Sequence, residues 1–578
     1  MSHAVLIFTF SPIQSFISQA RRTADLYAGS RILAELARAA LEAIACAGST
    51  IVYPARAGGG EQSDTPNKLV AVVPRERAAD LGRAAEDALH RRWSQIVAAA
   101  GGNALAHGLP GHDDPGWQSI WRRQTAPRYL WQCFWAAARI GPDGYKGAYQ
   151  QASRALDAAK RSRLFLPAEE WGTKDSLSGQ REALHRQGER ASDYWRQVSN
   201  LPRVTGALLR PFGRERLDAI GTVKRFWPHR DSFLSTSSIA SQPFLDAARE
   251  QAPAQLQAYR QDLGTFLGRW LHEPRTDPDW PYDGDLLFQE TLTPERLQAS
   301  YRSGIETAAL GPPLQALKKL HRTVGFPPSP YYAVVALDGD SVGEHISKLL
   351  EEGNPQEAHC QFGQKLSDFA DVVQKVAALH SVSLVYNGGD DVLALAPASS
   401  ALPFAHELAQ EFHRVTAATA SAGIAIAHHL SPLDAALEQA HQAQNLAKDI
   451  PGKDAVCVTL MRRGGEAITA RGPWCSVIAN LDQVTQYLAA RKLSARLPYD
   501  IWQLAYAIPD ANDMLRAELR RLVGRRAEAL SGQQANALTE ALGRWAEALT
   551  ETVEGLAQWL IIARFLAGAE GGSDAFVS

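Results

Sequence analysis

The chain has 578 residues, of which 45% are hydrophobic and 21% are charged, and its formal net charge is −2. This length exceeds what one hydrophobic core supports, so we expect three or four domains. The small net charge excludes a protein that binds nucleic acid through its overall charge, and any RNA contact must be local or shared with partners.

The five cysteines are far apart, without a Cys-x-x-Cys pair. This spacing argues against a zinc ribbon and against a disulfide framework, and it fits a reducing compartment. No run of eighteen apolar residues occurs, and the start of the sequence lacks the basic leader and cleavage site of a signal peptide. We therefore predict a cytoplasmic protein that makes no membrane contact.

The N-terminal segment begins with a predicted strand at residues 4–10 (AVLIFTF), followed by a stretch of helical periodicity. Two further strand-like stretches, STIVYP and KLVAVVP, are separated by the Gly-rich loop ARAGGGEQSDTPN. The predicted order is therefore β-α-β-β, which repeats the order predicted for residues 332–396, and we assign residues 1–165 to a first domain.

Residues 166–326 are predicted to form an α-rich domain, with helices over 243–272 and 294–322 and a Pro cluster at its end. Its stretch Lys224-Arg225-Phe226-Trp227-Pro228-His229-Arg230 mixes cations with aromatic rings. Two interpretations fit this stretch: side chains that stack on RNA, or side chains that surround a small core.

The segment 327–465 carries the most informative motifs. The apolar run Tyr332–Leu337 stops at Asp338-Gly339-Asp340, and two further apolar runs are joined across Asn387-Gly388-Gly389-Asp390. Adjacent glycines accept the backbone angles of a two-residue β-hairpin turn. Carboxylates therefore follow two predicted strands of one sheet.

Several carboxylates within a few Å of each other require cations to neutralise them. Mg²⁺ or Mn²⁺ would do so and leave positions for phosphate oxygens, which suits two-metal nucleotidyl transfer. The glycines would let phosphates approach the backbone closely. A surface hairpin would also use Asn-Gly-Gly-Asp, so the hairpin motif alone also fits a scaffold without a reaction.

Downstream, SAGIAIAHHLSP is predicted as a strand, and residues 433–458 as a helix, a turn and a strand. From residue 466 onwards the pattern is helical to the end, which predicts a small bundle over 466–578. Its arginines at 520, 521, 525 and 526 fit a solvated face or a partner surface.

PPSPYYAVVALDGDSVG followed by LVYNGGDDVLAL resembles the second Palm (cyclase-like) domain of the large subunit of type III CRISPR effector complexes, most of all the Cmr subtype. FSPIQSFISQARRTADLYAGS resembles the N-terminal signature of that family. The resemblance implies an α+β fold with two ferredoxin-like Palm domains, an intervening α-rich domain and a C-terminal helical bundle. The first Palm copy, which lacks the carboxylates, would be catalytically dead.

The same resemblance implies two losses. The four zinc-ribbon cysteines of the family correspond to Asp175, Ser178, Asp218 and Gly221, so the ribbon is degenerate, we expect no zinc, and packing around Trp171, Phe226 and Trp227 would hold the loops. The HD nuclease domain that many members carry before the N-terminal signature is expected to be absent. His112-Asp113 is expected to be a turn, so we predict no HD-type DNase activity.

The resemblance also implies roles for individual residues. Asp338 would bind both metal ions with help from the Gly339 carbonyl, and Asp390 and Asp391 would complete the site, with Asp390 the firmer ligand. The backbone of Ser341, Val342 and Gly343 would face the triphosphate, and Lys448 would contact phosphate as in diguanylate cyclases. Gly388 and Gly389 would admit the nucleotide. Arg21, Arg22 and Ser30 would face a second nucleotide in the first copy, although the arginines also fit a solvated helix face.

By this resemblance the chain converts ATP into cyclic oligoadenylate second messengers when its antiviral complex binds target RNA, although the same chemistry would also adenylylate another molecule. Expected partners are the other Cmr subunits, including the small helical subunit, and, through the complex, CRISPR guide RNA and target RNA. Two alternatives remain open: a stand-alone diguanylate- or adenylate-type cyclase, and a catalytically silent structural scaffold.

Overall fold

The computed structural model describes residues 2–45, 48–55, 65–162, 170–201, 204, 208–210, 213–228, 233–268, 271, 277–301, 310–508, 513–549 and 552–571. Most of the predicted Gly-rich loop 55–67 therefore lies outside the described residues, as do His229 and Arg230. None of the helices in the described part has the length and apolar character needed to cross a bilayer.

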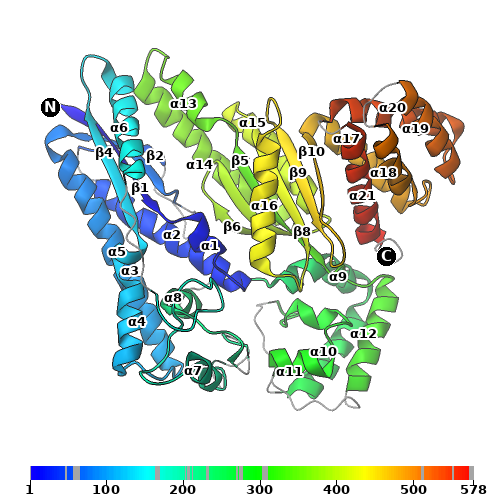
Figure 1. The fold of residues 1–578 in the computed structure, drawn as a ribbon, viewed down its shortest axis with the longest axis horizontal. Helices are drawn as coiled ribbons and strands as arrows, with labels where there is room; N and C mark the ends of the chain where they lie inside the picture. Colours follow the sequence, from blue (N-terminus) through cyan, green and yellow to red (C-terminus); the bar gives the residue numbers. More distant parts are fainter. Residues whose placement is uncertain are drawn as a thin grey trace.

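The first domain is built on a four-stranded antiparallel sheet in the order β2-β3-β1-β4 (Figure 1). Successive side chains of a strand point to opposite faces, so one set of β1 side chains packs against α2 and α3, and the other against α6. The elements are β1 (His3–Ser11), α1 (Gln14–Ser18), α2 (Thr23–Ile44), β2 (Thr50–Tyr53), β3 (Lys68–Pro74), α3 (Ala78–Ala106), β4 (Gln132–Arg139) and α6 (Gly144–Arg161).

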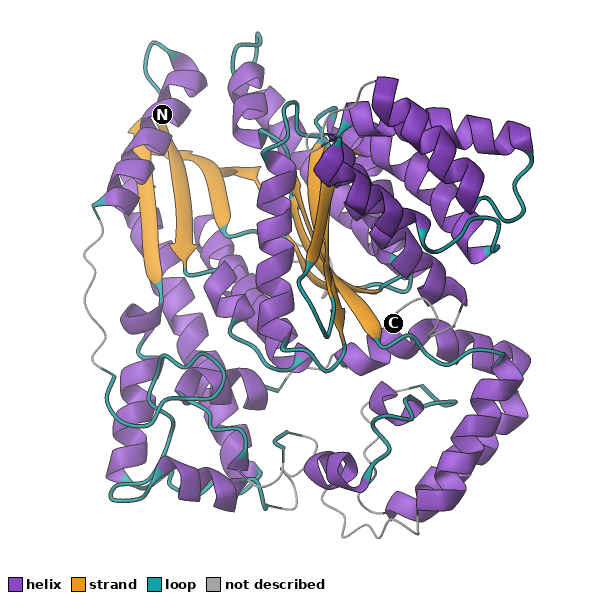
Figure 2. Cartoon of the chain, turned by 45° about the vertical axis from the view of Figure 1, so that its right-hand side comes forward, coloured by secondary structure: helices purple, strands orange, loops and turns teal. Residues whose placement is uncertain are grey.

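The second sheet has six strands in the order β10-β9-β8-β5-β7-β6, antiparallel except for the parallel pair β8 and β9. Figure 2 shows it as a group of strands separate from the first sheet. The strands are β5 (Tyr331–Gly339), β6 (Ser383–Asn387), β7 (Asp391–Pro397), β8 (Ala420–His428), β9 (Ala455–Met461) and β10 (Ile468–Pro473).

The two sheets share a topology. The order β2-β3-β1-β4 is repeated in the second sheet as β6-β7-β5-β8, with antiparallel pairing at every step. The predicted repeat of one β-α-β-β unit is therefore confirmed at the level of strand order.

The central strand β5 is buried on both faces. Ala333 and Val335 belong to the cluster with α14 and α15, whereas Tyr332 and Val334 belong to the cluster that contains α16, α9 and the first-domain helix α2. The second face of this sheet is therefore closed partly by the first domain. The helices are α9 (Thr236–Gln251), α13 (Val342–Leu349), α14 (Pro355–Leu379), α15 (Ala401–Thr416) and α16 (Leu433–Lys448).

The middle segment is α-rich, but its helices differ from the predicted ones. The expected helix over 243–272 is two helices, because Pro253 has no amide hydrogen to continue α9 and instead begins α10. Residues 302–309, inside the expected helix over 294–322, lie outside the described residues. The remaining elements are α4 (Pro115–Thr125), α5 (Pro127–Leu130), α7 (Ala191–Val198), α8 (Ala219–Phe226), α10 (Pro253–Leu267), α11 (Pro294–Tyr301) and α12 (Gly311–Val324).

The C-terminal part is a helical bundle, but the expectation of helix from residue 466 is wrong for β10. This strand pairs with β9 and buries Ile468, Ala470 and Gly472 alternately, which is a period-two pattern. The bundle helices are α17 (Trp474–Ala489), α18 (Leu497–Ala507), α19 (Asp513–Arg526), α20 (Gly532–Ala548) and α21 (Thr552–Gly571).

Candidate active site

The turn between β6 and β7 is the predicted hairpin, but of its two glycines only Gly389 has a positive φ. The Gly388 amide donates to the Asp391 carbonyl at 2.9 Å, and Gly389 has φ of +98°, which favours glycine. A Cβ at Gly388 would collide with the Tyr386 side chain. The two glycines are thus needed for different reasons, one for backbone conformation and one for space.

The strand register brings two of the predicted carboxylates to one place. Asp338 on β5 lies directly opposite Asp391 on β7, and opposite residues of an antiparallel pair share a face. Asp390 follows Gly389 in the turn, and its carbonyl accepts a hydrogen bond from the Gly339 amide at 2.9 Å. The turn and the end of β5 are therefore fastened together by backbone contacts, with Asp391 on the Asp338 face.

The acids of the turn are costly to ionise. Burial, with the Asp390 charge as the second cause, raises the pKa of Asp391 to about 7, and burial also raises the pKa of Asp390. Carboxyl groups in this state favour a neutralising cation. Their oxygen atoms and the Gly339 carbonyl are the donor types that Mg²⁺ and Mn²⁺ prefer, so the residues present fit such ions.

Lys448 ion-pairs with Asp338 from the last residue of α16. Burial, together with the nearby charge of Lys453, lowers the pKa of Lys448. Close packing fixes this helix on the sheet, since a Cβ at Gly423 of β8 would overlap the α16 backbone at Ala440 and Gln444. The predicted phosphate-contacting lysine therefore lies at the carboxylates.

Sequence reasoning assigned no individual role to two neighbouring residues, Lys453 and Asp340. Lys453 donates from Nζ to the Ser341 Oγ at 2.8 Å, and it belongs to the same Ala-Lys-x-x-x-Gly-Lys run as Lys448, which was the available signal. Asp340 is 6% exposed, and its Oδ2 accepts from the hydroxyls of Thr419 and Ser421 at 2.9 and 3.1 Å and from the Asp454 amide at 3.0 Å. Asp340 thus ties the end of β5 to β8 and to the loop that carries Lys453.

The start of α13 also lies beside this site. Ser341, the residue before the helix, has φ of +51°, and Val342 and Gly343 form its first turn. The Gly343 Cα faces open space. Their contact with a triphosphate stays a prediction.

The residues singled out on the first domain are less accessible. Ser30 is 1% exposed within α2, and the Arg22 guanidinium donates to Glu215 at 2.9 Å. Arg21 is exposed. Their part in a second nucleotide pocket stays a prediction.

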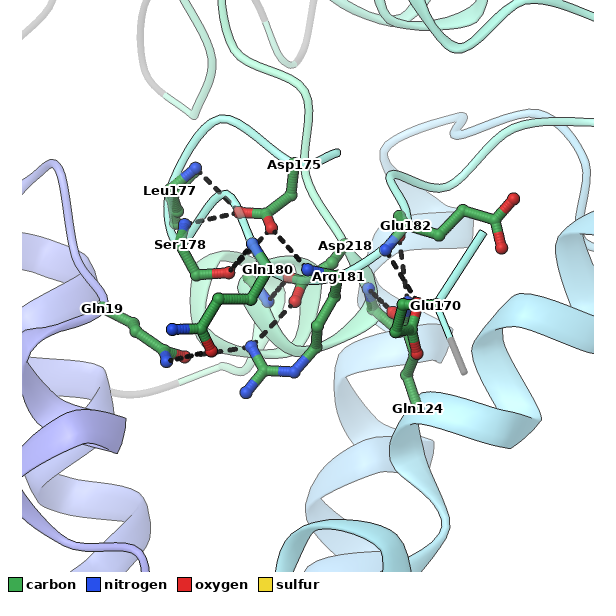
Figure 3. A network of polar contacts seen from close by, with 12 residues as sticks. Gln19, Gln124, Glu170, Asp175, Leu177, Ser178, Gln180, Arg181, Glu182 and Asp218 are labelled. Carbon is green, nitrogen blue, oxygen red and sulfur yellow. Dashed lines mark hydrogen bonds and ion pairs between the residues drawn. The ribbon is translucent and has the colours of Figure 1, made fainter. Parts of the chain in front are cut away.

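The positions that correspond to zinc ligands form a polar network instead (Figure 3). Asp175 accepts from the amides of Leu177 and Ser178 at 2.8 and 2.6 Å, and Asp218 accepts from the Gly221 amide at 2.6 Å. Arg181 bridges to Asp218 at 3.1 Å. Hydrogen bonds and an ion pair therefore order both loops.

The expectation that aromatic packing holds these loops is only partly met. Phe226 is buried, and Trp227 packs beside the neighbouring core. Trp171 is 68% exposed and therefore does not pack into a core. Packing holds the loops through other side chains, since Leu177, Leu184 and Leu217 lie in one buried core cluster with Phe226. The carboxylates that accept backbone amides add to this packing.

The basic and aromatic stretch from Lys224 is not an RNA-binding surface in the described residues. Lys224 Nζ contacts the carbonyls of Phe16 and Gln19, and Arg225 binds Asp25 through two contacts of 2.5 Å. Both cations are buried. Of the two interpretations, the structure supports the one in which these side chains surround a core.

His112 and Asp113 are exposed and lie before α4, as expected for a turn. Within the described residues, the possible metal ligands that come within 4.8 Å of one another are Glu290, His428 and His429, whereas the three predicted carboxylates do not form such a group. The Leu430 amide donates to Nδ1 of His428 at 3.1 Å, so a neutral His428 carries its proton on Nε2, which faces Glu290 at 3.4 Å. A protonated Nε2 has no lone pair for a metal ion, so this cluster is a hydrogen-bonded contact between the middle segment and β8.

The C-terminal arginines are held by acids of the bundle. Arg526 and Arg525 lie 2.5 and 3.9 Å from Asp500, Arg521 lies 2.8 Å from Glu518, and Arg520 lies 3.6 Å from Glu540. The exposed members fit the solvated face considered above.

Taken together, the sheet order, the acids at the end of β5 and in the β6–β7 turn, and the lysine at the end of α16 define a palm protein of the nucleotidyl-cyclase type. Residues 331–457 match the model of the Cas10/Cmr2 second palm domain, and residues 5–98 match that of the N-terminal part of the CRISPR-associated protein Cmr2. Over these two regions the chain is therefore similar to the Cas10/Cmr2 family.

A curated relative is the CRISPR system Cmr subunit Cmr2 of Pyrococcus furiosus, which is 31% identical over 188 residues. That match covers 27% of this chain and 21% of the relative, so it spans about a fifth of the relative's length. The fold is similar to a chain of the Type III-B Cmr-beta complex in its apo state (TM-score 0.65, 13% identity, 98% of this chain and 82% of the other). It is also similar in the complex bound to cognate target RNA (TM-score 0.64, 13% identity, 98% and 83%).

Proposed function

We propose that this chain is the large subunit of an RNA-guided Cmr-type antiviral complex, in which it makes cyclic oligoadenylates from ATP once target RNA is bound. The observation that carries the proposal is the placement of Asp338 opposite Asp391, with Lys448 on Asp338. Nothing in sheet packing requires acids and a lysine at this strand end. Metal-dependent nucleotidyl transfer uses both.

Asp338, Asp390 and Asp391, with the Gly339 carbonyl, would hold two Mg²⁺ or Mn²⁺ ions. When bound, such ions supply neutralising charge and lower the pKa of an attacking hydroxyl. Lys448 would exchange its ion pair with Asp338 for contact with phosphate oxygens. Lys453 would hold Ser341, and through it the first turn of α13, against the triphosphate.

The proposed partners are the other Cmr subunits, the small helical subunit among them, and the guide and target RNAs. The likeness of the whole fold to a chain of Cmr-beta supports this proposal, because two palm-like units, the middle segment and the helical tail are all matched together. A stand-alone cyclase has no use for the first palm-like unit, the middle segment or the helical tail.

The test is to incubate the purified complex with labelled ATP, Mg²⁺ and matched target RNA, and to identify the products. We expect cyclic oligoadenylates with matched RNA and none with mismatched RNA. The matched control is the double variant Asp390→Ala plus Asp391→Ala, which should abolish turnover and keep RNA binding.

The other outcomes separate the alternatives. Adenylylation of a different molecule would keep nucleotidyl transfer and reject the cyclic product. Turnover by a chain that purifies without guide RNA or companion subunits would indicate a stand-alone cyclase. If no condition gave turnover, the chain would be a catalytically silent scaffold of the complex.

A further inference from the structure

A side chain of the first domain touches the hairpin turn of the second domain. Tyr53, the last residue of β2, donates its hydroxyl to the Gly388 carbonyl at 3.1 Å. The two residues are 335 positions apart in the chain. This contact therefore joins the sheet without carboxylates to the turn that carries Asp390 and Asp391.

The strand that carries Tyr53 is held closely against the second domain. A Cβ at Gly363 of α14 would lie 2.8 Å from the Val52 carbonyl, so β2 and α14 approach as closely as their backbones allow. A Cβ at Gly389 would lie 3.5 Å from Leu366 of the same helix and 3.6 Å from the Tyr53 hydroxyl. The turn therefore lies between α14 and Tyr53. Figure 1 shows α14 beside β2, the strand that carries Tyr53.

The hydroxyl acts on the peptide unit that precedes Gly389. Its carbonyl points to Tyr53, while the Gly388 amide donates to Asp391 and the Asp390 carbonyl accepts from Gly339. The contacts with Asp391 and Gly339 lie within the second domain, whereas the contact with Tyr53 comes from the first domain. Loss of the Tyr53 hydroxyl would leave the Gly388 peptide free to rotate and would loosen the position of both acids.

We propose that Tyr53 is a positioning residue, through which the first domain sets the orientation of the carboxylates in the second domain. This inference rests on the proposed function. It assigns the first domain a part in the reaction that needs no carboxylates of its own.

The test is Tyr53→Phe in the complete complex, which keeps the ring and removes the hydroxyl. We expect kcat to fall about three- to tenfold, the rate equivalent of one neutral hydrogen bond, with KM for ATP nearly unchanged. We also expect a higher Mg²⁺ concentration for half-maximal rate and faster amide hydrogen exchange in residues 387–391. If Tyr53 contributed only to packing, a Tyr53→Phe variant with an unchanged thermal unfolding midpoint would also keep the wild-type kcat, Mg²⁺ dependence and hydrogen exchange.

Tyr145→Phe is the matched control. Its hydroxyl also crosses between the domains, to Nδ1 of His359 at 2.9 Å, but it does not touch the turn. We expect it to leave kcat and the Mg²⁺ dependence unchanged. Equal rates for Tyr53→Phe and wild type, or equal losses in the two variants, would overturn the inference. Absence of turnover in the wild-type complex would instead overturn the proposed function, so the two failures give different results.

Discussion

The chemistry of the candidate site depends on a few ionisable side chains whose surroundings oppose their charged form. Asp391 has a pKa of about 7 because it is half-buried and lies next to the charge of Asp390. Lys448 is held by Asp338, yet burial lowers its pKa. Such pairs of displaced pKa values are typical of catalytic sites.

Asp391→Asn should change how stability depends on pH. The pKa of Asp391 is raised on folding from 3.8 to about 7, so without divalent ions the wild type loses stability as pH rises from about 4 to about 7. The loss has an upper bound of about 4 kcal/mol. Asp391→Asn lacks this loss, as thermal unfolding in EDTA at several pH values would show. Added Mg²⁺ should stabilise the wild type more than the variant, and parallel pH curves would contradict the prediction.

Asp25→Asn should destabilise the fold, because it leaves the buried Arg225 guanidinium without its closest partner. Removing one member of a buried ion pair costs about 3 kcal/mol or more. Denaturant unfolding measures this loss. The control is Asp80→Asn, which breaks an exposed pair with Arg83 and should cost less than about 1 kcal/mol. Similar costs for the two variants would show that burial does not govern the Asp25 pair.

At the scale of elements, the site depends on how closely α16 lies on the second sheet. Gly423 of β8 has no room for a Cβ against the α16 backbone, and the same helix ends at Lys448. The position of this lysine is therefore set by a glycine on a neighbouring strand.

Gly423→Ala should push α16 away from the sheet, at a cost of about 1 to 3 kcal/mol, and should lower ATP turnover because Lys448 moves with the helix. Unfolding and rate measurements on the same preparation test both effects. The control Gly102→Ala lies in α3, where a Cβ meets nothing within 4 Å, and it should be neutral or stabilising by up to about 1 kcal/mol. Full activity in Gly423→Ala would show that the lysine is not positioned this way.

At the scale of the whole molecule, the two palm-like units are joined by specific contacts near the site and away from it. Tyr145 of α6 bonds His359 of α14, and Lys146 ion-pairs with Glu351 at 2.5 Å. Burial, with a smaller contribution from Lys68, lowers the pKa of His359 to about 4. This histidine makes the domain contact sensitive to acid.

Stability should fall as pH decreases from about 6.5 to about 4, because the unfolded chain binds a proton at His359 that the folded chain does not. The contribution of His359 is about 3 kcal/mol. His359→Gln, which keeps a polar partner for Tyr145, should lose stability less steeply over this range. Equilibrium unfolding at pH 7, 6, 5 and 4 tests the difference in slope, and identical slopes would assign the acid sensitivity to other groups.

Local patterns in the sequence determined the strands that end in carboxylates, the Gly-Gly turn and the repeated β-α-β-β order. Each is readable because a period-two run or a turn residue expresses a preference of its own few residues. The same reasoning missed β10, whose six residues pair with β9, and it predicted one helix over 243–272 although Pro253 divides this stretch.

The tertiary structure alone decided that Asp391 lies opposite Asp338, that Arg225 is buried on Asp25 and that Tyr53 reaches the Gly388 carbonyl. These facts depend on strand register and on domain packing. They join residues that are 53, 200 and 335 positions apart. No local preference specifies which side chains will meet, because the contact energy is shared among all the elements that pack between them.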